Sequence, residues 1–466
     1  MSKHVVVVGG GIAGLATAYY LGKSGVQVTL IEKDNRLGGK VITDQSDGFV
    51  IEGGPDSFIT QKPWALQLAR ELGLEDNFLG TNDDRRETYI LRRRKLNKIP
   101  HGLHSIVPTR LMPLATSRLI SWFGKLRMGM DLFIKPKTDY EDESLADFIR
   151  RRLGKEALEV LAEPMLAGIH VSDAETLSLL ASFPRFRDTE RQYGSLTRGM
   201  VAARKMHNQH KAQHANGTPH KHPSMFMTFK GGLTRLIEAL RESIQGEILT
   251  GKGVTALTKA DAGYQLTLDD GHVIQADAVV LATPSYVAAK LLQAEQPDLA
   301  QKLAAIRYVS TATVSIGYRK ADFQHPLNGF GFVIPRTEPT RLLACTWTST
   351  KFDHRAPDEH VLLRVFVGGP RREELVSQDD DTLVQLVRDE LKTIMGIEAE
   401  PTIARVFRWN KSNPQYEVGH LERIDEIESL CPAGIYVTGS AYRGVGMPDC
   451  IHQGLQTAEK IIETLQ

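Results

Sequence analysis

The chain has 466 residues, which is too long for one ordinary hydrophobic core and predicts two or three domains. Hydrophobic residues make up 41% of the chain and charged residues 24%, the proportions of a globular protein. The formal net charge of +1 excludes an overall field that attracts nucleic acid, so no nucleic-acid partner is expected. Three widely spaced cysteines exclude a disulfide framework and a CxxC metal pair, which fits a reducing compartment.

No run of 18 uncharged apolar residues occurs, so the sequence predicts no membrane-spanning helix. The first residues, Met-Ser-Lys-His, lead directly into an apolar run at 5–8, which we interpret as a strand with no signal peptide before it. These features predict a cytoplasmic protein, with peripheral contact at a membrane as an additional location.

The first elements follow the order strand, glycine turn, helix, strand. The four valines at 5–8 predict a buried parallel strand, and the apolar run at 26–31 predicts another. Between them, glycines are concentrated at 9–14, and residues 15–23 have a helical pattern. This order is typical of a dinucleotide-binding βαβ unit.

The rest of the chain alternates helical and strand patterns. These predict helices at 63–74, 380–394 and 451–465, a mainly helical region at 103–200, a small antiparallel sheet within 254–274, buried strands at 277–284 and 434–439, and further strands within 308–410. The pattern therefore predicts an α/β chain with a second, α+β domain.

The polar segment 204–222 contains five histidines and no apolar periodicity. They are His207, His210, His214, His220 and His222. We interpret the segment as a mobile loop, because it is polar and contains Gly217 and Pro219. A metal site is the alternative, since imidazole is a common ligand, but the spacing matches no compact metal motif and no metal is expected.

The glycine turn fits the pattern G-x-G-x-x-G. Its residues are Gly9, Gly10, Gly11, Ile12, Ala13 and Gly14, and Leu15 follows. The first glycine permits a tight turn, the second lets a pyrophosphate approach the backbone, and the third allows close helix–strand packing. The amino terminus of the helix then offers free N–H groups to phosphates.

Glu32 ends the second strand, where a carboxylate can accept hydrogen bonds from ribose hydroxyls. The glycine motif alone does not separate NAD from FAD. The segment Lys33–Lys40, which ends Arg-Leu-Gly-Gly-Lys, resembles the R-x-G-G-[KR] segment of the amine oxidase and carotenoid desaturase flavoproteins. In that superfamily the segment wraps the FAD pyrophosphate, so the resemblance implies non-covalently bound FAD.

Four later segments resemble the protoporphyrinogen/coproporphyrinogen oxidases. They are G-P-D-S-F at 54–58, E-P-M-L-A-G-I-H at 163–170, the stretch from Trp409 to His420 that contains P-Q-Y, and G-V-G-M-P-D-C at 444–450. Together with the glycine turn, these matches cover essentially the whole chain. The resemblance is closest to the coproporphyrinogen III oxidases of Gram-positive bacteria.

The resemblance implies an FAD-dependent enzyme of haem biosynthesis. It would oxidise coproporphyrinogen III to coproporphyrin III by removing six electrons, with flavin N5 as the hydride acceptor, oxygen as the final acceptor and hydrogen peroxide as a product. The alternatives are a protoporphyrinogen IX oxidase on the same fold, an amine oxidase, and a non-catalytic flavin-binding protein. Thr88 stands where protoporphyrinogen-using members have an arginine, and this departure favours coproporphyrinogen.

The expected fold is a Rossmann-like FAD-binding domain with an α+β substrate domain and a mainly helical insert. The predicted FAD-binding domain comprises 1–75, 224–290 and 425–466, the substrate domain 76–102 and 291–424, and the insert 103–223.

The resemblance also assigns site residues. Those for FAD are Gly9 to Leu15, Glu32, Lys33, Gly39, Lys40, Gly54, Pro55, Asp56, Ser57, Val254, Trp409, Val445, Gly446 and Met447. Because the flavin carries the electrons, no protein residue is nominated as catalytic and no metal is required.

Substrate contacts are expected at Lys62, Arg92, Ile169 and His170. Lys62 and Arg92 are candidates because propionates need cations, although the cluster around Arg92 also fits a solvated face. His170 also fits a shape-filling wall of the cavity. Residues 103–134 predict either a helical lid or an amphipathic surface that contacts membrane. Transient contact with ferrochelatase or a membrane surface is therefore a further expectation.

Overall fold

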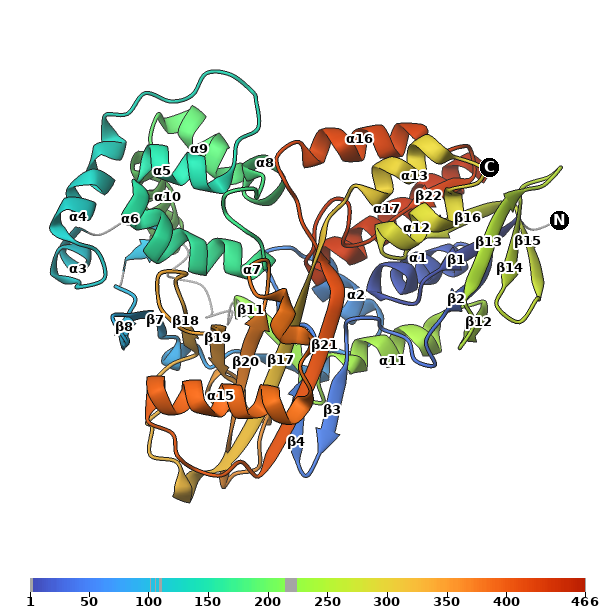
Figure 1. Cartoon of the computed structure of the whole chain (residues 1–466). Helices are drawn as coiled ribbons and strands as arrows, with labels where there is room; N and C mark the ends of the chain where they lie inside the picture. The colour runs from blue at the N-terminus through green and yellow to red at the C-terminus, as the bar shows by residue number, and fades with distance from the viewer. Residues whose placement is uncertain (1–2, 101, 105, 109–110, 214–223, 466) are drawn as a thin grey trace. The chain divides into compact units, whose positions relative to one another are not determined.

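The computed structural model describes residues 3–100, 102–104, 106–108, 111–213 and 224–465 (Figure 1). The chain divides into two compact units. Unit 1 comprises Met1–Thr81, Ser224–Tyr308 and Leu421–Gln466, and unit 2 comprises Asn82–Pro223 and Val309–His420. Among the described residues, no helix combines the length and the apolar character needed to cross a bilayer.

Unit 1 is built on a five-stranded parallel sheet. Its strand order is β12 (Glu247–Thr250), β2 (Gln27–Glu32), β1 (His4–Val8), β16 (Ala278–Leu281) and β22 (Ile435–Val437). The chain adds strands on both sides of β1, so the topological switch point lies between β1 and β16. Ligands of open parallel sheets bind at such a point, at the carboxyl ends of the strands.

Both faces of this sheet are covered, which explains the run of four valines in β1. Val5 and Val7 pack into one core with helices α1 (Ile12–Lys23), α2 (Trp64–Glu71), α11 (Thr234–Ser243) and α17 (Met447–Leu465). Val6 and Val8 pack into the other core. That core includes α12 (Ser285–Leu292), α13 (Pro297–Ala304), α16 (His420–Leu430) and the small sheet of β13 (Val254–Lys259), β14 (Tyr264–Leu268) and β15 (Val273–Ala276). The predicted βαβ unit is confirmed.

Unit 2 contains a seven-stranded mixed sheet. In order, its strands are β21 (Ile403–Pro414), β17 (Tyr308–Arg319), β20 (His360–Gly368), β19 (Leu342–Trp347), β18 (Gly331–Val333), β7 (Thr88–Arg92) and β8 (Lys95–Lys98). Helix α15 (Asp380–Met395) lies along one face (Figure 1) and contributes Leu383, Val387 and Leu391 to the core.

The helices of unit 2 include α3 (Leu111–Thr116), α4 (Trp122–Gly129), α5 (Leu145–Arg152), α7 (Gly168–His170), α9 (Pro184–Tyr193) and α10 (Leu196–Gln213). A ten-residue π-helix, η4 (Leu158–Ala167), precedes α7 and contains Pro164. The helical pattern predicted for 103–200 is confirmed apart from its first residues, which form strands β9 (Leu103–His104) and β10 (Val107–Pro108).

A buried ionic network joins these helices. The Arg152 guanidinium is fully buried, and its Nε donates to the equally buried Asp131 at 2.6 Å. Glu190, also fully buried, lies 3.4 Å from Arg152 and accepts hydrogen bonds from Arg151 and Arg187. Each charge in the network therefore faces at least one opposite charge.

The prediction of a loop at 204–222 is wrong for residues 204–213, because helix α10 continues to Gln213. Residues 204–213 contain neither glycine nor proline and include the good helix formers Ala, Lys, Met and Gln, so nothing in the sequence ends the helix earlier. The remaining residues, 214–222, lie outside the described part of the chain, as do the side chains of His207 and His210.

Candidate active site

The glycine turn connects β1 to α1 at the carboxyl edge of the parallel sheet. Gly9 has a φ of 111°, and its N–H donates to the carbonyl of Ile31 at 2.8 Å. A Cβ on Gly9 would lie 2.9 Å from the carbonyl oxygen of Ala282, and one on Gly14 would overlap the carbonyl oxygen of Gly9. A Cβ on Gly11, by contrast, would meet no atom within 4 Å. Gly9 and Gly14 thus serve packing, whereas Gly11 leaves the backbone open to a ligand.

The amino terminus of α1 has the character of an anion site. No described side chain caps it, and its first turn contains no acidic residue. Its N–H groups and the positive end of its dipole are therefore available to a phosphate. Such a terminus at the switch point fits the diphosphate of a dinucleotide.

The Gly38-Gly39-Lys40 segment lies against this turn, as its predicted role requires. The N–H of Gly38 donates to the carbonyl of Gly10 at 2.8 Å, and a Cβ on Gly39 would lie 3.2 Å from the Cα of Gly11. The Lys40 ammonium donates to the hydroxyl of Ser440 at 3.3 Å, and burial lowers the pKa of Lys40. A neighbouring diphosphate would compensate for this burial and favour the charged form.

Glu32 lies at the end of β2, next to the turn. Its carboxylate accepts the N–H of Gly10 at 2.6 Å and the N–H of Asp34 at 2.9 Å. The N–H of Lys252 donates to the carbonyl of Glu32 at 3.0 Å, so the segment before β13 runs alongside. Lys33 and Val254, the two other residues predicted for the adenosine end, therefore lie close to Glu32.

The segment Gly54–Ser57 precedes a short strand, β5 (Phe58–Ile59), of unit 1. The hydroxyl of Ser57 donates to the Asp56 carboxylate at 2.7 Å. Just before the segment, the buried Glu52 carboxylate accepts hydrogen bonds from Thr43 and from the N–H of Leu233, both at 2.8 Å. These bonds anchor the start of the segment.

Sequence reasoning missed two buried hydroxyls at the carboxyl edge of the sheet. The N–H of Thr438, which follows β22, donates to the carbonyl of Leu281, and Thr283 follows Ala282 beside Gly9. The hydroxyls of Thr283 and Thr438 are buried, and among the described residues neither has a hydrogen-bond partner. Because buried polar atoms are normally paired, they fit a polar ligand such as FAD at this edge.

Helix α17 begins where Val445, Gly446 and Met447 were predicted to contact the flavin. The N–H of Cys450 donates to the carbonyl of Gly446 at 2.9 Å, and burial raises the pKa of the Cys450 thiol to about 12. Lys62, predicted to contact substrate, forms an ion pair with Asp449 in the first turn of this helix, with 2.6 Å between Nζ and Oδ1.

The other predicted residues belong to unit 2. Trp409 lies in β21, and the Arg92 guanidinium donates to Glu156 at 2.7 Å. His170 ends α7 and packs edge-on against Phe183, with ring centroids 5.2 Å apart. Ile169 also lies in α7, but its side chain is outside the described part of the structure.

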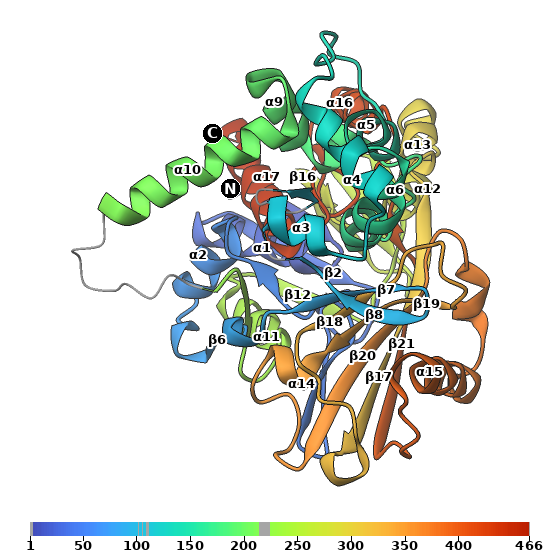
Figure 2. The same cartoon turned by 90° about the vertical axis from the view of Figure 1, so that its left-hand side faces the viewer.

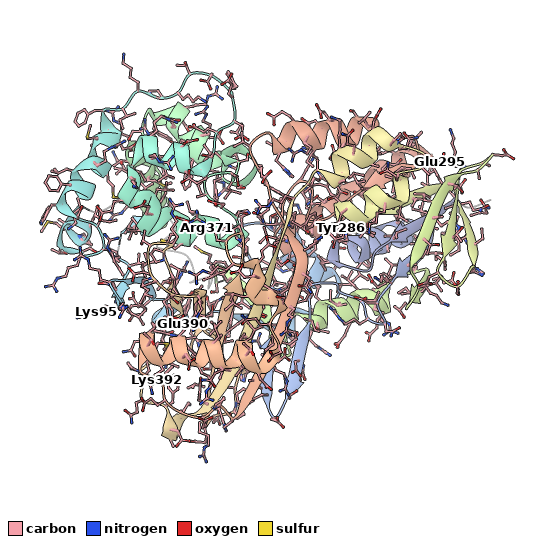
Figure 3. The ribbon with its side chains drawn as sticks, in the orientation of Figure 1. Lys95, Tyr286, Glu295, Arg371, Glu390 and Lys392 are labelled. Carbon is pink, nitrogen blue, oxygen red and sulfur yellow. The ribbon has the colours of Figure 1, made fainter. Side chains whose placement is uncertain are left out.

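A second charged cluster in unit 2 surrounds Glu163 of the π-helix η4. Burial raises the pKa of Glu163 to about 7, although Arg336 and Arg371 lower it. Arg336 Nε lies 2.9 Å from the carboxylate, and Arg371, labelled in Figure 3, lies 3.7 Å away and donates to Asp173. π-helical turns are frequent at functional sites. Glu163 opens the E-P-M-L-A-G-I-H segment, but no sequence pattern predicts that its pKa is raised.

Comparison with known proteins identifies the family. The model of the flavin containing amine oxidoreductases matches residues 12–462. The coproporphyrinogen III oxidase of Bacillus subtilis is 39% identical over 97% of this chain and 96% of its own length. Protoporphyrinogen oxidase 1 of Arabidopsis thaliana is 30% identical over 99% and 88%, respectively.

The fold of this chain also matches the folds of solved flavoenzyme structures. The crystal structure of an Exiguobacterium protein assigned as a protoporphyrinogen oxidase matches with a TM-score of 0.88 and 34% identity, and the match covers 100% of both chains. A putrescine oxidase structure matches with a TM-score of 0.72 at 17% identity, which supports the fold alone. The predicted fold class and the FAD cofactor are confirmed. The chain therefore belongs to the flavin-containing amine oxidoreductases and is an FAD-dependent oxidoreductase.

Proposed function

We propose that this enzyme oxidises coproporphyrinogen III to coproporphyrin III with oxygen, in haem biosynthesis. The observation that carries the proposal is the ranking of relatives. Three bacterial relatives named coproporphyrinogen III oxidase are 35–39% identical over nearly the whole chain, whereas five plant relatives named protoporphyrinogen oxidase are 26–31% identical. Bound FAD supplies the acceptor for six electrons in three steps, and oxygen regenerates it with release of hydrogen peroxide.

The protein's part in this reaction is to hold and orient the bound FAD. The N–H groups at the start of α1 and the Lys40 ammonium hold the diphosphate, and Glu32 accepts hydrogen bonds from the ribose. The remaining proposed contacts are Lys33, Gly54, Pro55, Asp56, Ser57, Val254, Trp409, Val445, Gly446 and Met447. Their support is the family match, together with the positions of Lys33 and Val254 near Glu32 and of Val445, Gly446 and Met447 at the start of α17.

The four propionates of the substrate require cations. Lys62, Arg92, Ile169 and His170 are the proposed substrate contacts. Both cations already hold a carboxylate, since Lys62 is paired with Asp449 and Arg92 with Glu156. A propionate must therefore share or replace these partners, which limits the affinity that each cation can contribute.

The alternative substrate is protoporphyrinogen IX, because the Exiguobacterium structure carries that assignment at 34% identity. A direct comparison decides between them. The holoenzyme is given each porphyrinogen in air, and porphyrin fluorescence and hydrogen peroxide are followed. The proposal predicts a higher kcat/KM for coproporphyrinogen III. An equal or higher value for protoporphyrinogen IX would reject it.

We further propose that the helices of unit 2 touch a lipid surface. Helices α3 and α4 lie side by side (Figure 2), and the 3₁₀ turn η3 (Met130–Leu132) packs against α4. These three elements expose large apolar side chains. These side chains are Met112, Trp122, Phe123, Leu126, Met130 and, just after η3, Phe133. The Lys125 ammonium lies 4.4 Å from the centre of the Trp122 ring, so a cation borders the apolar group, as at amphipathic membrane surfaces.

Sedimentation with anionic phospholipid vesicles tests this contact. The Trp122→Ser, Phe123→Ser double variant should lose most vesicle binding while keeping turnover of soluble porphyrinogen. If the unaltered protein binds no vesicles but is retained by immobilised ferrochelatase through the same two residues, the surface is a protein-docking site and the lipid proposal is wrong.

A further inference from the structure

Helices α1 and α17 run side by side and parallel in unit 1 (Figure 1). A Cβ on Gly454 of α17 would lie 2.7 Å from the carbonyl oxygen of Ala13 and 2.9 Å from the Cβ of Ala16, so the two backbones are in close contact. Burial raises the pKa of Tyr20, with smaller contributions from Glu71 and Glu459, which places Glu459 of α17 near Tyr20. Later residues of α17 therefore lie beside later residues of α1, so the two helices run in the same direction.

This arrangement extends α17 beyond the start of α1. Gly454 lies level with the turn from Ala13 to Thr17, since a Cβ there would meet atoms of both residues, and α17 begins seven residues earlier, at Met447. The middle of that turn is about three residues into α1, which begins at Ile12. The start of α17 therefore lies about four residues, or about 6 Å at a rise of about 1.5 Å each, beyond the start of α1.

The position of the flavin ring follows from this offset. With the diphosphate at the start of α1 and the adenosine ribose at Glu32 on the β2 side, the ribityl chain must leave toward β22. Lys40 already bridges to Ser440, which follows β22. A five-carbon ribityl chain spans a distance similar to the offset between the helices, which would bring the ring to the first turn of α17.

An ion pair occupies that turn. Both carboxylate oxygens of Asp449, the third residue of α17, accept hydrogen bonds from the Lys62 ammonium, at 2.6 and 2.7 Å. The Asp449 side chain is only 15% exposed. A Cβ on Gly444 would lie 2.5 Å from the Cβ of Asp449, and one on Gly446 would lie 3.0 Å from its Oδ2. The carboxylate is thus held against the glycine loop by Lys62.

The charges of Lys62 and Asp449 would affect how readily a nearby flavin is reduced. Reduction adds negative charge to the ring, which the positive end of α17 favours. A bare Asp449 carboxylate in the same turn would oppose that charge, and Lys62 cancels it. We propose that Lys62 is a positioning residue that neutralises and orients Asp449 and thereby sets the reduction potential of the bound FAD.

Reduction potentials of the purified holoprotein test this proposal, measured by equilibration with redox dyes. Lys62→Met should shift the equilibrium toward oxidised flavin by about tenfold or more, which lowers the potential by about 30 mV or more for a two-electron couple. Asp449→Asn should shift it in the opposite direction. The double variant should return to within about threefold of the unaltered protein, because both charges are then absent.

Lys23→Met is the matched control. Lys23 ends α1 and pairs with Glu71 at 2.8 Å, so the change breaks a similar ion pair at the other end of that helix. It should leave the potential unchanged.

Shifts of the same sign in both single variants, or no shift in either, would overturn the proposal, because loss of structure alone predicts no opposite signs. If Lys62→Met retains no FAD, Asp449→Asn decides alone: a raised potential supports the proposal, and an unchanged or lowered one rejects it. The measurement involves no porphyrinogen, so it stands or falls independently of the proposed substrate.

Discussion

The Glu32 carboxylate accepts the backbone N–H of Gly10 at 2.6 Å, and this bond ties the end of β2 to the glycine turn that follows β1. The side chain expected to bind ribose therefore also orders the turn expected to bind the diphosphate. Each oxygen already accepts one backbone N–H, and each keeps a lone pair for a ribose hydroxyl.

Glu32→Gln tests this double role. The amide keeps the size of the side chain but loses the charge that strengthens its hydrogen bonds. We expect FAD affinity to fall by about 1.5–3 kcal/mol, roughly 10- to 150-fold. Fluorescence titration of the apoprotein with FAD measures it, with Asp34→Asn at the exposed neighbouring position as the control. Equal losses in both variants would contradict a specific role for Glu32.

Two glycines of the turn should respond differently to alanine. In Gly14→Ala the new Cβ overlaps the carbonyl oxygen of Gly9, so we expect the free energy of unfolding to fall by about 1–3 kcal/mol. In Gly11→Ala the Cβ meets no protein atom, so apoprotein stability should change by less than about 0.5 kcal/mol while FAD binding weakens. Urea unfolding of both apoproteins compares them. A Gly11→Ala variant that binds FAD normally would argue against a ligand at this backbone.

These local features were predictable because they lie within about 30 residues of one another. The turn, Glu32 and the Gly38-Gly39-Lys40 segment each have a sequence signature with a physical reason. Thr283, Thr438 and Gly454 do not, because they reach the site only through sheet pairing and helix packing. The ion pair of Lys62 with Asp449 has no sequence signature either, because the two residues lie 387 positions apart and no local pattern links them.

The buried network of unit 2 should be essential for stability. Arg152→Met leaves the fully buried Asp131 and Glu190 without this cation, so we expect the free energy of unfolding to fall by about 3–5 kcal/mol. Arg150→Met breaks only exposed pairs, with Glu175 and Asp147, and should cost less than about 1 kcal/mol. Urea denaturation followed by circular dichroism compares the two. Similar small losses would show that the network contributes little.

Glu163 should make stability depend on pH. Its pKa in the folded chain is raised to about 7 from an ordinary value of 4.5, so the folded state binds more protons between these values. Stability therefore declines as pH rises through this window. Relative to that of the Glu163→Gln variant, the free energy of unfolding of the unaltered protein should fall by about 1–3 kcal/mol between about pH 5 and pH 8.

Glu175→Gln, a more exposed member of the same cluster, is the control and should retain the slope. Thermal unfolding at four pH values provides the comparison. If stability relative to Glu163→Gln is flat or rises with pH, the folded Glu163 does not carry a raised pKa.

Anaerobic titration of the holoenzyme tests most directly whether bound FAD takes electrons from coproporphyrinogen III, as proposed. Addition of coproporphyrinogen III without oxygen should bleach the flavin absorbance, with up to three equivalents of FAD reduced per porphyrin formed, and air should restore it with release of hydrogen peroxide. A flavin that stays oxidised with coproporphyrinogen III but is bleached by a primary amine would show that the substrate is an amine and not this porphyrinogen.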